Sequence, residues 1–291
     1  MLEDKRTLPP PWIAYPEIER YSIGWRMGYG ESYIDRWGAW LYNLAEDERE
    51  KYQELFPEPV TWKGYWDEEY EEDCYQRNEF FIELWREKGT PKYSIGQIRE
   101  AYARGEKKDY IFFWKPQLSP DGSIAKSCLS QWWMADFLSE ADTYCCMEQF
   151  MMAKKAELFG DEEIRRQILQ CKNPKEIKAL GRKVKNFDEK VWEEAKYPIV
   201  LNGNYFKFTQ NPGLKDFLLS TGESVIVEAS PFDAVWGVKM GQKDDNILNP
   251  MKWRGKNLLG FALMEVRDEI RRVWKNADMC KSVKEILSKD K

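Results

Sequence analysis

Apolar residues that recur three and four positions apart, in segments bounded by proline and glycine, most constrain what this chain can fold into. That spacing places apolar side chains on one face of an α-helix, whereas a half-buried strand requires strict alternation. The clearest case runs from Tyr144 to Asp161 and includes Met147, Phe150 and Leu158. Such segments recur along most of the 291 residues, so the sequence predicts a mainly α fold with a few short strands.

The boundaries of the expected elements follow from helix-starting and helix-ending residues. Pro57 and Pro59 are expected to end the first helix, Ser94 to cap the third, and Pro198 to interrupt the longest. Helices are predicted over residues 32–55, 66–89, 94–106, 144–161, 161–171, 173–184, 188–210, 211–222 and 258–274. Short strands are predicted over 110–114 and 224–230, and a long loop over 231–257.

Residues 1–105 differ from the rest of the chain because they are rich in tryptophan, tyrosine and acidic residues. We interpret them as a helical N-terminal extension, followed by a second domain over residues 106–291. Their aromatic side chains are expected to form a core or a subunit contact rather than a stacking platform for bases. The sequence does not indicate the oligomeric state.

Composition excludes several classes of function. A formal net charge of -5 argues against a broad basic surface for a nucleic-acid backbone, although a small basic pocket is compatible with it. The chain has six cysteines without a CxxC pair and no histidine, so neither a zinc site of usual spacing nor a histidine-based catalytic dyad is expected. Without a signal core or a long apolar run, a cytoplasmic location without membrane association is expected.

Glu148 lies in the most apolar part of the helix predicted over 144–161. A carboxylate there loses hydration unless another group partners it. It is either a structural partner of a lysine or a functional carboxylate that stabilises a cationic carbon. Lys155 follows two turns later on the same face. The loop over 231–257 has aromatic, acidic, basic and amide side chains that suit a nucleotide or sugar-phosphate, although a plain surface loop is the alternative.

Several segments, in the same order along the chain, resemble the NADAR domain, also called the YbiA-like family. They include "CLSQWW", "MEQFMMAKKAELFGD", "GNYFKFTQNPGLKDFLLSTG", "VEASPFDAVWGVKMG" and "WRGKNLLGFALMEVRDEI". The resemblance extends from about Tyr110 to Trp274. It implies a mainly helical domain with a pocket for an ADP-ribose-like ligand, and N-glycosidase activity without a cofactor.

The resemblance also implies which residues form the site. Its catalytic residues fall on Glu148, Lys155 and Asp233. Its ligand-binding positions fall on Gln131, Trp132, Gln149, Arg182, Trp192, Trp236, Gly237, Lys256 and Asn257. Two positions depart from the family pattern: Ser130–Trp132 replaces an "SNF" element, and Gln149 replaces a histidine common in the family. Because an amide cannot carry a proton near pH 7, Gln149 is not expected to transfer one.

One branch of the family is associated with cleavage of phosphoribosyl intermediates of riboflavin synthesis, and another removes ADP-ribose from guanine in DNA. We expect the second activity here, on an ADP-ribose-containing ligand and with ADP-ribosylated DNA as a candidate partner. The riboflavin-type glycosidase and a binding module without turnover are the alternatives. Lys155 either neutralises phosphate or attacks the ribose to form an imine, and the sequence does not separate these two roles.

Overall fold

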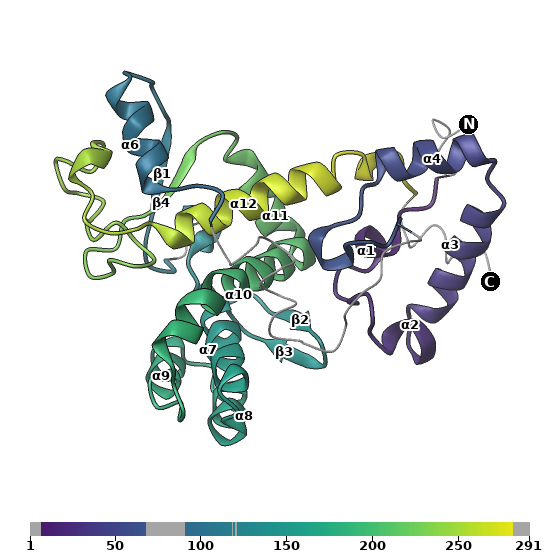
Figure 1. Cartoon of the computed structure of the whole chain (residues 1–291), viewed down its shortest axis with the longest axis horizontal. Helices are drawn as coiled ribbons and strands as arrows, with labels where there is room; N and C mark the ends of the chain where they lie inside the picture. Colours follow the sequence, from purple (N-terminus) through teal and green to yellow (C-terminus); the bar gives the residue numbers. More distant parts are fainter. Residues whose placement is uncertain (1–6, 68–90, 118, 120, 282–291) are drawn as a thin grey trace. The chain divides into compact units, whose positions relative to one another are not determined.

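A computed structural model describes residues 7–67, 91–117, 119, 121–281 of the chain (Figure 1). The described part is mainly helical with four short strands, which confirms the predicted fold class. It divides into two compact units. Unit 1 comprises Met1–Cys74, Leu138–Asp142 and Glu269–Lys291, and unit 2 comprises Tyr75–Phe137 and Thr143–Asp268. Within the described ranges, no helix combines the length and the apolar character needed to cross a membrane.

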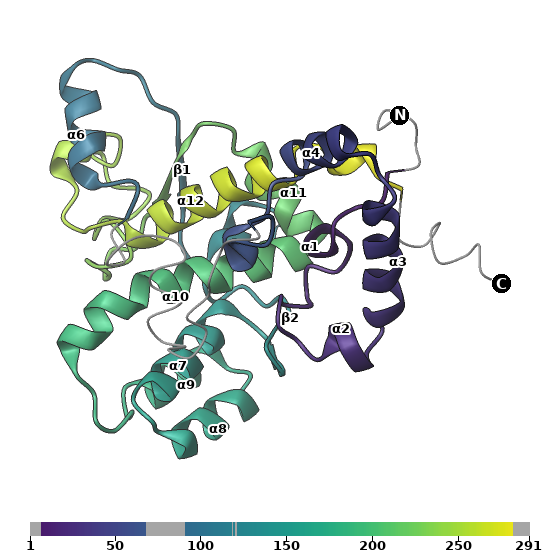
Figure 2. The same ribbon diagram turned by 45° about the vertical axis from the view of Figure 1, so that its right-hand side comes forward.

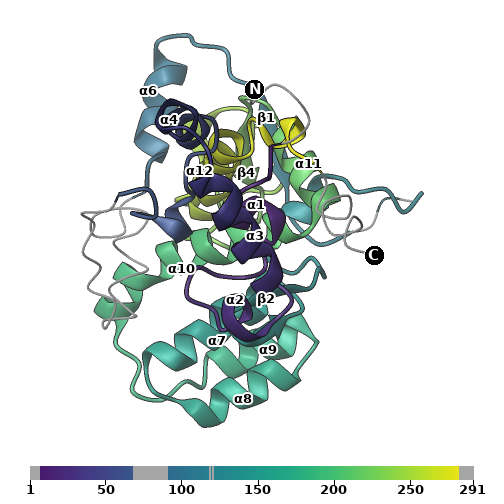
Figure 3. The ribbon, with the colours of Figure 1, turned by 90° about the vertical axis from the view of Figure 1, so that its right-hand side faces the viewer.

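Unit 1 consists of short helices whose aromatic side chains form its core. Figure 3 shows α1 (Pro11–Ala14), α2 (Gly24–Met27) and α3 (Glu31–Tyr42) gathered together. Trp12 packs against Trp62 with ring centroids 5.2 Å apart, and the Trp37 indole donates a hydrogen bond to the Tyr52 hydroxyl at 2.9 Å. The elements are α1 (Pro11–Ala14), α2 (Gly24–Met27), α3 (Glu31–Tyr42), α4 (Glu46–Leu55), η1 (Val60–Trp62) and η5 (Ala277–Met279). The described part of the tryptophan-rich region is therefore helical, and its aromatic side chains include a buried core.

Unit 2 is arranged around α10 (Glu189–Gln210), which is buried from Ala195 to Thr209. Figures 1 and 2 show α7 (Met147–Leu158), α8 (Glu162–Gln170) and α9 (Pro174–Gly181) grouped beside α10. The remaining helices are α6 (Ile95–Ala103), η3 (Lys126–Leu129), α7 (Met147–Leu158), α8 (Glu162–Gln170), α9 (Pro174–Gly181), α11 (Pro212–Ser220), η4 (Pro250–Lys252) and α12 (Leu258–Val273), of which α12 continues into unit 1. The predicted cap of α6 is confirmed, because the Ser94 side chain accepts a hydrogen bond from the Gln97 N–H.

The two predicted strands are present and pair with each other. β1 (Tyr110–Phe113) lies parallel to β4 (Val225–Glu228), in a register that places Phe113 opposite Glu228. A second pair, β2 (Phe137–Ser139) and β3 (Asp142–Tyr144), was not predicted. It occupies the start of the segment expected to be helical from Tyr144, so α7 begins only at Met147.

Two predicted helices differ from the structure. The helix expected over 32–55 is two helices, α3 and α4, separated at Asn43–Ala45. The interruption expected at Pro198 is absent, because α10 continues through it. Proline has no N–H to donate to the carbonyl four residues earlier, here that of Glu194, an exposed residue near the start of the helix. The helix predicted over 66–89 lies largely outside the described residues.

Candidate functional site

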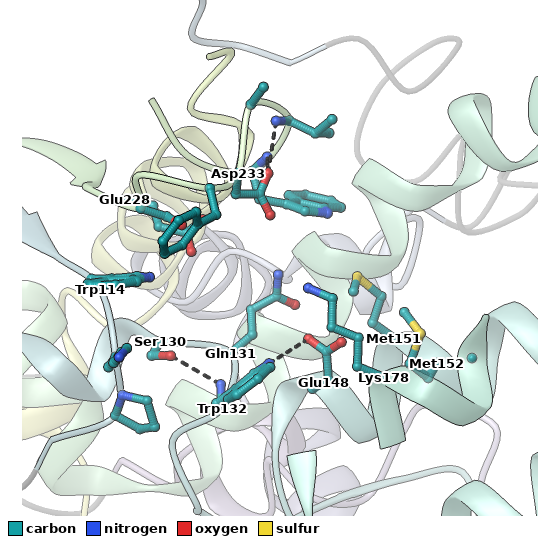
Figure 4. Close-up of a pocket in the computed structure, with 18 of the residues that line it drawn as sticks. Trp114, Ser130, Gln131, Trp132, Glu148, Met151, Met152, Lys178, Glu228 and Asp233 are labelled. Atoms are coloured by element: carbon teal, nitrogen blue, oxygen red, sulfur yellow. Dashed lines mark hydrogen bonds between the residues drawn. The ribbon is translucent and has the colours of Figure 1, made fainter. Parts of the chain in front are cut away.

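A cavity of about 650 Å³ lies in unit 2. Its wall is formed by α7, α9 and the start of α10, and by the segments that follow β1, η3 and β4 (Figure 4). A cavity of this size is typical of a site for a small molecule. The lining includes the three carboxyl groups of Glu148, Glu228 and Asp233.

Glu148 lies in the first turn of α7 and is only 2% exposed. One carboxylate oxygen, Oε2, accepts a hydrogen bond from the Trp132 indole at 3.0 Å, whereas the buried Oε1 has no protein partner. Burial raises the pKa of Glu148, while Lys178 and the Trp132 hydrogen bond act in the opposite direction. The Glu148 carboxyl group therefore offers a ligand one oxygen that the protein leaves unpartnered.

Glu228 is the last residue of β4, and its backbone is held on both sides. Its N–H donates to Asn257 Oδ1 at 3.0 Å, and its carbonyl accepts from the Val238 N–H at 3.0 Å. The side-chain oxygen Oε2 is buried without a hydrogen-bond partner. Burial, together with the Asp233 carboxylate, raises the pKa of Glu228 to about 8. Glu228 is thus a carboxyl group that keeps its proton at neutral pH.

Asp233 shapes the loop in which it lies. Its Oδ1 accepts hydrogen bonds from the N–H groups of Val235 and Trp236, at 2.9 and 2.8 Å. These two bonds form a tight turn that includes several cavity-lining residues. Asp233 therefore has a structural task in addition to any contact with a ligand.

Four cationic side chains line the same cavity. The Lys155 ammonium donates to the Gly181 carbonyl at 3.0 Å and lies 4.2 Å from the Phe187 ring centroid and 5.4 Å from that of Trp192. Burial lowers the pKa of Lys155, which increases the fraction of neutral amine. The other three cations are Lys115, Lys178 and Arg182. Cations beside carboxylates can neutralise phosphate while an acidic group acts on a neighbouring sugar.

The structure brings together eight of the twelve site residues implied by the resemblance. Those that line the cavity are Gln131, Trp132, Glu148, Lys155, Arg182, Trp192, Asp233 and Trp236. Those that lie elsewhere are Gln149, Gly237, Lys256 and Asn257.

Gln149 is not placed to bind a ligand, because its amide is used within the protein. Its oxygen accepts from the Cys145 N–H at 2.7 Å, and its nitrogen donates to the carbonyls of Ile168 and Cys171 at 3.0 and 2.8 Å. It is 1% exposed. Gln149 therefore lies outside the cavity lining and connects the start of α7 to the end of α8.

Asn257 and Gly237 act behind the cavity wall. The Asn257 side chain joins Ile226 and Glu228, donating to the first carbonyl and accepting from the second N–H. Its φ of 55° is left-handed, a conformation that asparagine adopts more readily than most residues. A Cβ at Gly237 would lie 2.8 Å from the Glu228 carbonyl oxygen, so the loop approaches β4 closely only with glycine there. Both residues position Glu228.

Lys256, the last of the four residues outside the cavity lining, is exposed.

Sequence reasoning missed Trp114, Lys178 and Glu228, which all line the cavity. Trp114 and Glu228 lie at the carboxyl ends of the two predicted strands, where parallel strands meet at one edge. Knowledge that the strands pair in parallel would have placed them together. Lys178 lies one turn before Arg182 and had no distinguishing signal in the sequence.

Buried lysine also supports the wall of the cavity. Lys207 of α10 donates to the carbonyls of Cys128 and Ser130 at 2.7 and 3.2 Å, and burial lowers its pKa to about 8. The adjoining Gln131 carbonyl accepts the Glu148 N–H at 3.0 Å. Among the described residues, no three His, Cys, Asp or Glu side chains are grouped so that they could hold a metal ion.

The model of the NADAR domain matches residues 112–271, more than half of the chain. The chain belongs to the NADAR domain family. All the cavity-lining residues lie inside the matched range. The twelve candidate site residues implied by the resemblance also lie within residues 112–271.

Some proteins that are similar in sequence to this chain are named N-glycosidases. N-glycosidase R617 of Acanthamoeba polyphaga mimivirus is 41% identical over 169 residues, covering 56% of this chain and 98% of that protein. N-glycosidase YbiA of Escherichia coli K12 is 29% identical over 131 residues, or 45% and 73% of the two chains. The solved structure of E. coli YbiA aligns with a TM-score of 0.45 and 26% identity, over 56% of this chain and 86% of that one.

A plant relative carries a different name. The chloroplastic riboflavin biosynthesis protein PYRR of Zea mays is 38% identical over 144 residues, covering 47% of this chain and 21% of that protein. The similarity to R617 and YbiA supports a glycosyl hydrolase activity of the N-glycosidase type for the chain.

Proposed function

We propose that the protein is an N-glycosidase that releases ADP-ribose from ADP-ribosylated guanine, in DNA or in nucleotides. The observation that carries this proposal is Glu148, a buried carboxyl group with one unpartnered oxygen at a cavity that also contains cationic side chains. Breaking an N-glycosidic bond places positive charge on the anomeric carbon of the ribose. A carboxylate beside that carbon stabilises the transition state more than the substrate.

The other side chains suit the remaining parts of such a substrate. Arg182 and Lys178 supply positive charge for a diphosphate, and Asp233 supplies a carboxylate oxygen for ribose hydroxyl groups. Trp192 and Trp236 offer aromatic surface for a base. Together these groups match a ligand that contains phosphate, sugar and a flat ring.

Lys155 has two proposed roles. Its pKa, lowered by burial, favours attack on the anomeric carbon by the neutral amine, with an imine to the opened ribose as intermediate. Its contacts with Phe187 and Trp192 equally suit an ammonium group that binds phosphate. The two roles make opposite predictions for chemical trapping.

The second candidate function is cleavage of a phosphoribosyl intermediate of riboflavin synthesis. It is favoured by the similarity to the maize protein PYRR, although the matched part is only 21% of that protein. Binding of ADP-ribose or NAD without turnover is a third reading, which the presence of Glu148, Lys155 and Asp233 at one cavity disfavours.

Mass spectrometry of reaction products separates these functions. The protein is incubated with an ADP-ribosylated oligonucleotide and, separately, with phosphoribosyl riboflavin intermediates, with Glu148→Gln as the control protein. We expect free ADP-ribose and restored guanine from the first incubation only. Products from the second incubation alone would assign the riboflavin-type function, and binding without any product would assign a binding module.

A further inference from the structure

One end of the cavity is formed where two parallel strands end together. Phe113 pairs with Glu228 in the register of β1 and β4, and the Ala229 N–H donates to the Phe113 carbonyl at 2.7 Å. The chain then places Trp114 after one strand and the segment with Phe232 after the other. Figure 4 shows Trp114 and Glu228 on one side of Glu148, and Met151 and Met152 on the other.

The aromatic rings at this end are available to a ligand. The Trp114 and Phe232 ring centroids are 6.1 Å apart with an interplanar angle of 51°, so the two rings diverge instead of stacking on each other. Phe232 is 83% exposed and Trp114 is partly exposed, although both line the cavity. The Lys115 ammonium lies 4.5 Å from the Trp114 ring centroid. Two divergent aromatic faces at the mouth of a cavity suit a flat heteroaromatic ring.

Glu228 lies beside Trp114, and hydrogen bonds on both sides hold its backbone. Asn257 and Val238 hold the backbone of Glu228, while its buried Oε2 has no partner. A buried polar atom without a partner is costly, and it is retained where a ligand supplies the missing hydrogen bond. In a chain without histidine, a carboxyl group is the natural proton donor for such a ligand.

We propose that this end of the cavity is the leaving-group subsite, where Trp114 and Phe232 bind a planar nitrogen base and Glu228 protonates it. The proposal rests on the proposed N-glycosidase function and adds the identity of the group that departs. It places the base at the strand ends and the sugar at Glu148, with Glu228 and Glu148 acting on opposite ends of one bond.

The chemistry balances without another reactant besides water. The bond between the anomeric carbon and the base nitrogen breaks, and its electron pair stays on the nitrogen. The Glu228 carboxyl proton moves to that nitrogen, so the base departs neutral. Water adds its hydroxyl to the anomeric carbon and releases one proton, which restores the acid form of Glu228. The burial that keeps Glu228 protonated at neutral pH prepares it for this step.

Binding of the two product halves tests the aromatic part of the subsite. Affinities for guanosine and for ADP-ribose are measured with the full chain and with Trp114→Ala and Phe232→Ala. Tyr102→Ala, an exposed aromatic of α6 outside the cavity lining, is the matched control. Loss of one stacking ring should weaken guanosine binding by about 5- to 150-fold and leave ADP-ribose binding within about twofold. Equal affinities for guanosine in all four proteins, or no guanosine binding by the wild type, would overturn the subsite.

Kinetics test the proton donor. Glu228→Gln keeps the shape of the side chain but cannot give up a proton, so we expect kcat to fall by about 10²- to 10⁴-fold with KM nearly unchanged. Glu223→Gln, the same substitution at an exposed residue before β4, should be unaffected. If the wild type turns over its substrate and the Glu228→Gln variant is equally active, the proton transfer from Glu228 is overturned. The proposed N-glycosidase function would then still stand. Absence of wild-type turnover on every N-glycoside offered would overturn the proposed function and the proton transfer with it.

Discussion

Glu148 and Glu228 carry the same functional group but have different surroundings. Burial raises the pKa of Glu148, but Lys178 and the hydrogen bond from Trp132 act in the opposite direction and favour its carboxylate form. Glu228 has a buried oxygen without a partner and lies near Asp233, so its surroundings favour the acid. Carboxyl groups whose surroundings separate their pKa values can divide the roles of charge stabiliser and proton donor.

The pH dependence of activity follows from these two groups. Activity should rise as Glu148 loses its proton and fall as Glu228 loses its own, with the decline of kcat/KM centred near pH 8. Burial is the main cause of the raised pKa of Glu228; Asp233 and Glu148 raise it further, and Lys178 acts in the opposite direction. A pH–rate profile of the wild type and of Glu228→Gln measures this. The variant should lose the alkaline decline, and a decline that persists in it belongs to another group.

Glu148→Gln should fold and bind ligand but lose most turnover. The neutral amide keeps an oxygen that can accept the Trp132 hydrogen bond. It lacks the negative charge that stabilises the developing cation. By analogy with loss of one transition-state contact, we expect kcat to fall by roughly 10²- to 10³-fold or more. Single-turnover kinetics and ADP-ribose titration measure the two effects separately. Hydrolysis near the wild-type rate would remove Glu148 from the mechanism.

Trapping with borohydride distinguishes the roles of Lys155. If the neutral amine forms an imine with the opened ribose, reduction during turnover leaves a covalent adduct on the peptide that contains Lys155. Peptide mass spectrometry locates the adduct. If no adduct forms and Lys155→Ala mainly weakens binding, the ammonium group is a phosphate contact.

At the scale of elements, helix signals in the sequence were more informative than strand signals. Ser94 predicted a cap that the structure contains, and the segment from Met147 to Leu158 is the predicted helix. The β2–β3 pair was missed because both strands are only three residues long and lack a clear alternation. The break at Asn43–Ala45 was missed because the segment contains neither proline nor glycine.

Helix spacing alone predicted only the pair on one face of α7, and the other candidate residues of the site came from the family resemblance. Glu148 and Lys155 lie two turns apart on α7 and both line the cavity. Glu228 and Trp114 meet only because β1 and β4 pair in parallel. This pairing is part of the tertiary structure, and no local sequence pattern predicts it. Gln149 was misplaced because its neighbour Glu148 faces the cavity, while successive helix residues point about 100° apart.

The loop over 231–257 is expected to respond to a ligand. Asp233 and Trp236 line the cavity, and the loop has little regular structure beyond η4, so ligand contacts should add to its stability. ADP-ribose should quench or shift tryptophan fluorescence and protect the loop from proteolysis.

Variants of this loop separate ligand contacts from loop shape. Asp233→Asn keeps an oxygen for the Val235 and Trp236 N–H groups, whereas Asp233→Ala loses it. Trp236→Ala and Asp233→Ala should each weaken binding by about 1–3 kcal/mol. Unchanged affinity in both, together with no protection by ligand, would make the loop a surface connection only.

At the scale of the whole molecule, the core of unit 1 is built from distant parts of the sequence. Val273 at the end of α12 belongs to the same buried cluster as Trp12, Trp25 and Trp62. The aromatic N-terminal segment therefore covers apolar side chains that a chain without it would expose. The domain boundary near residue 105 stays a prediction.

Two shortened chains test how much of the N-terminal region the NADAR domain requires. A chain starting at Pro91 lacks the partners of Val273 and should lose solubility. A chain starting at Lys107 also lacks α6, whose Arg99 donates to the carbonyls of Pro250 and Trp253 at 3.1 and 2.8 Å. Without these contacts, the loop over 231–257 should become more sensitive to protease. Sedimentation and limited proteolysis measure both effects. A soluble and fully active chain from Lys107 would contradict this.

The parallel pairing of β1 with β4 also bears on the order in which the molecule folds. The partners Tyr110 and Val225 are separated by more than a hundred residues, so the pair forms only after a long stretch of chain has been closed into a loop. Contacts of such high sequence separation form slowly, whereas helices form within microseconds. During refolding, helical signal should therefore recover before enzymatic competence, because Glu228 reaches its position last.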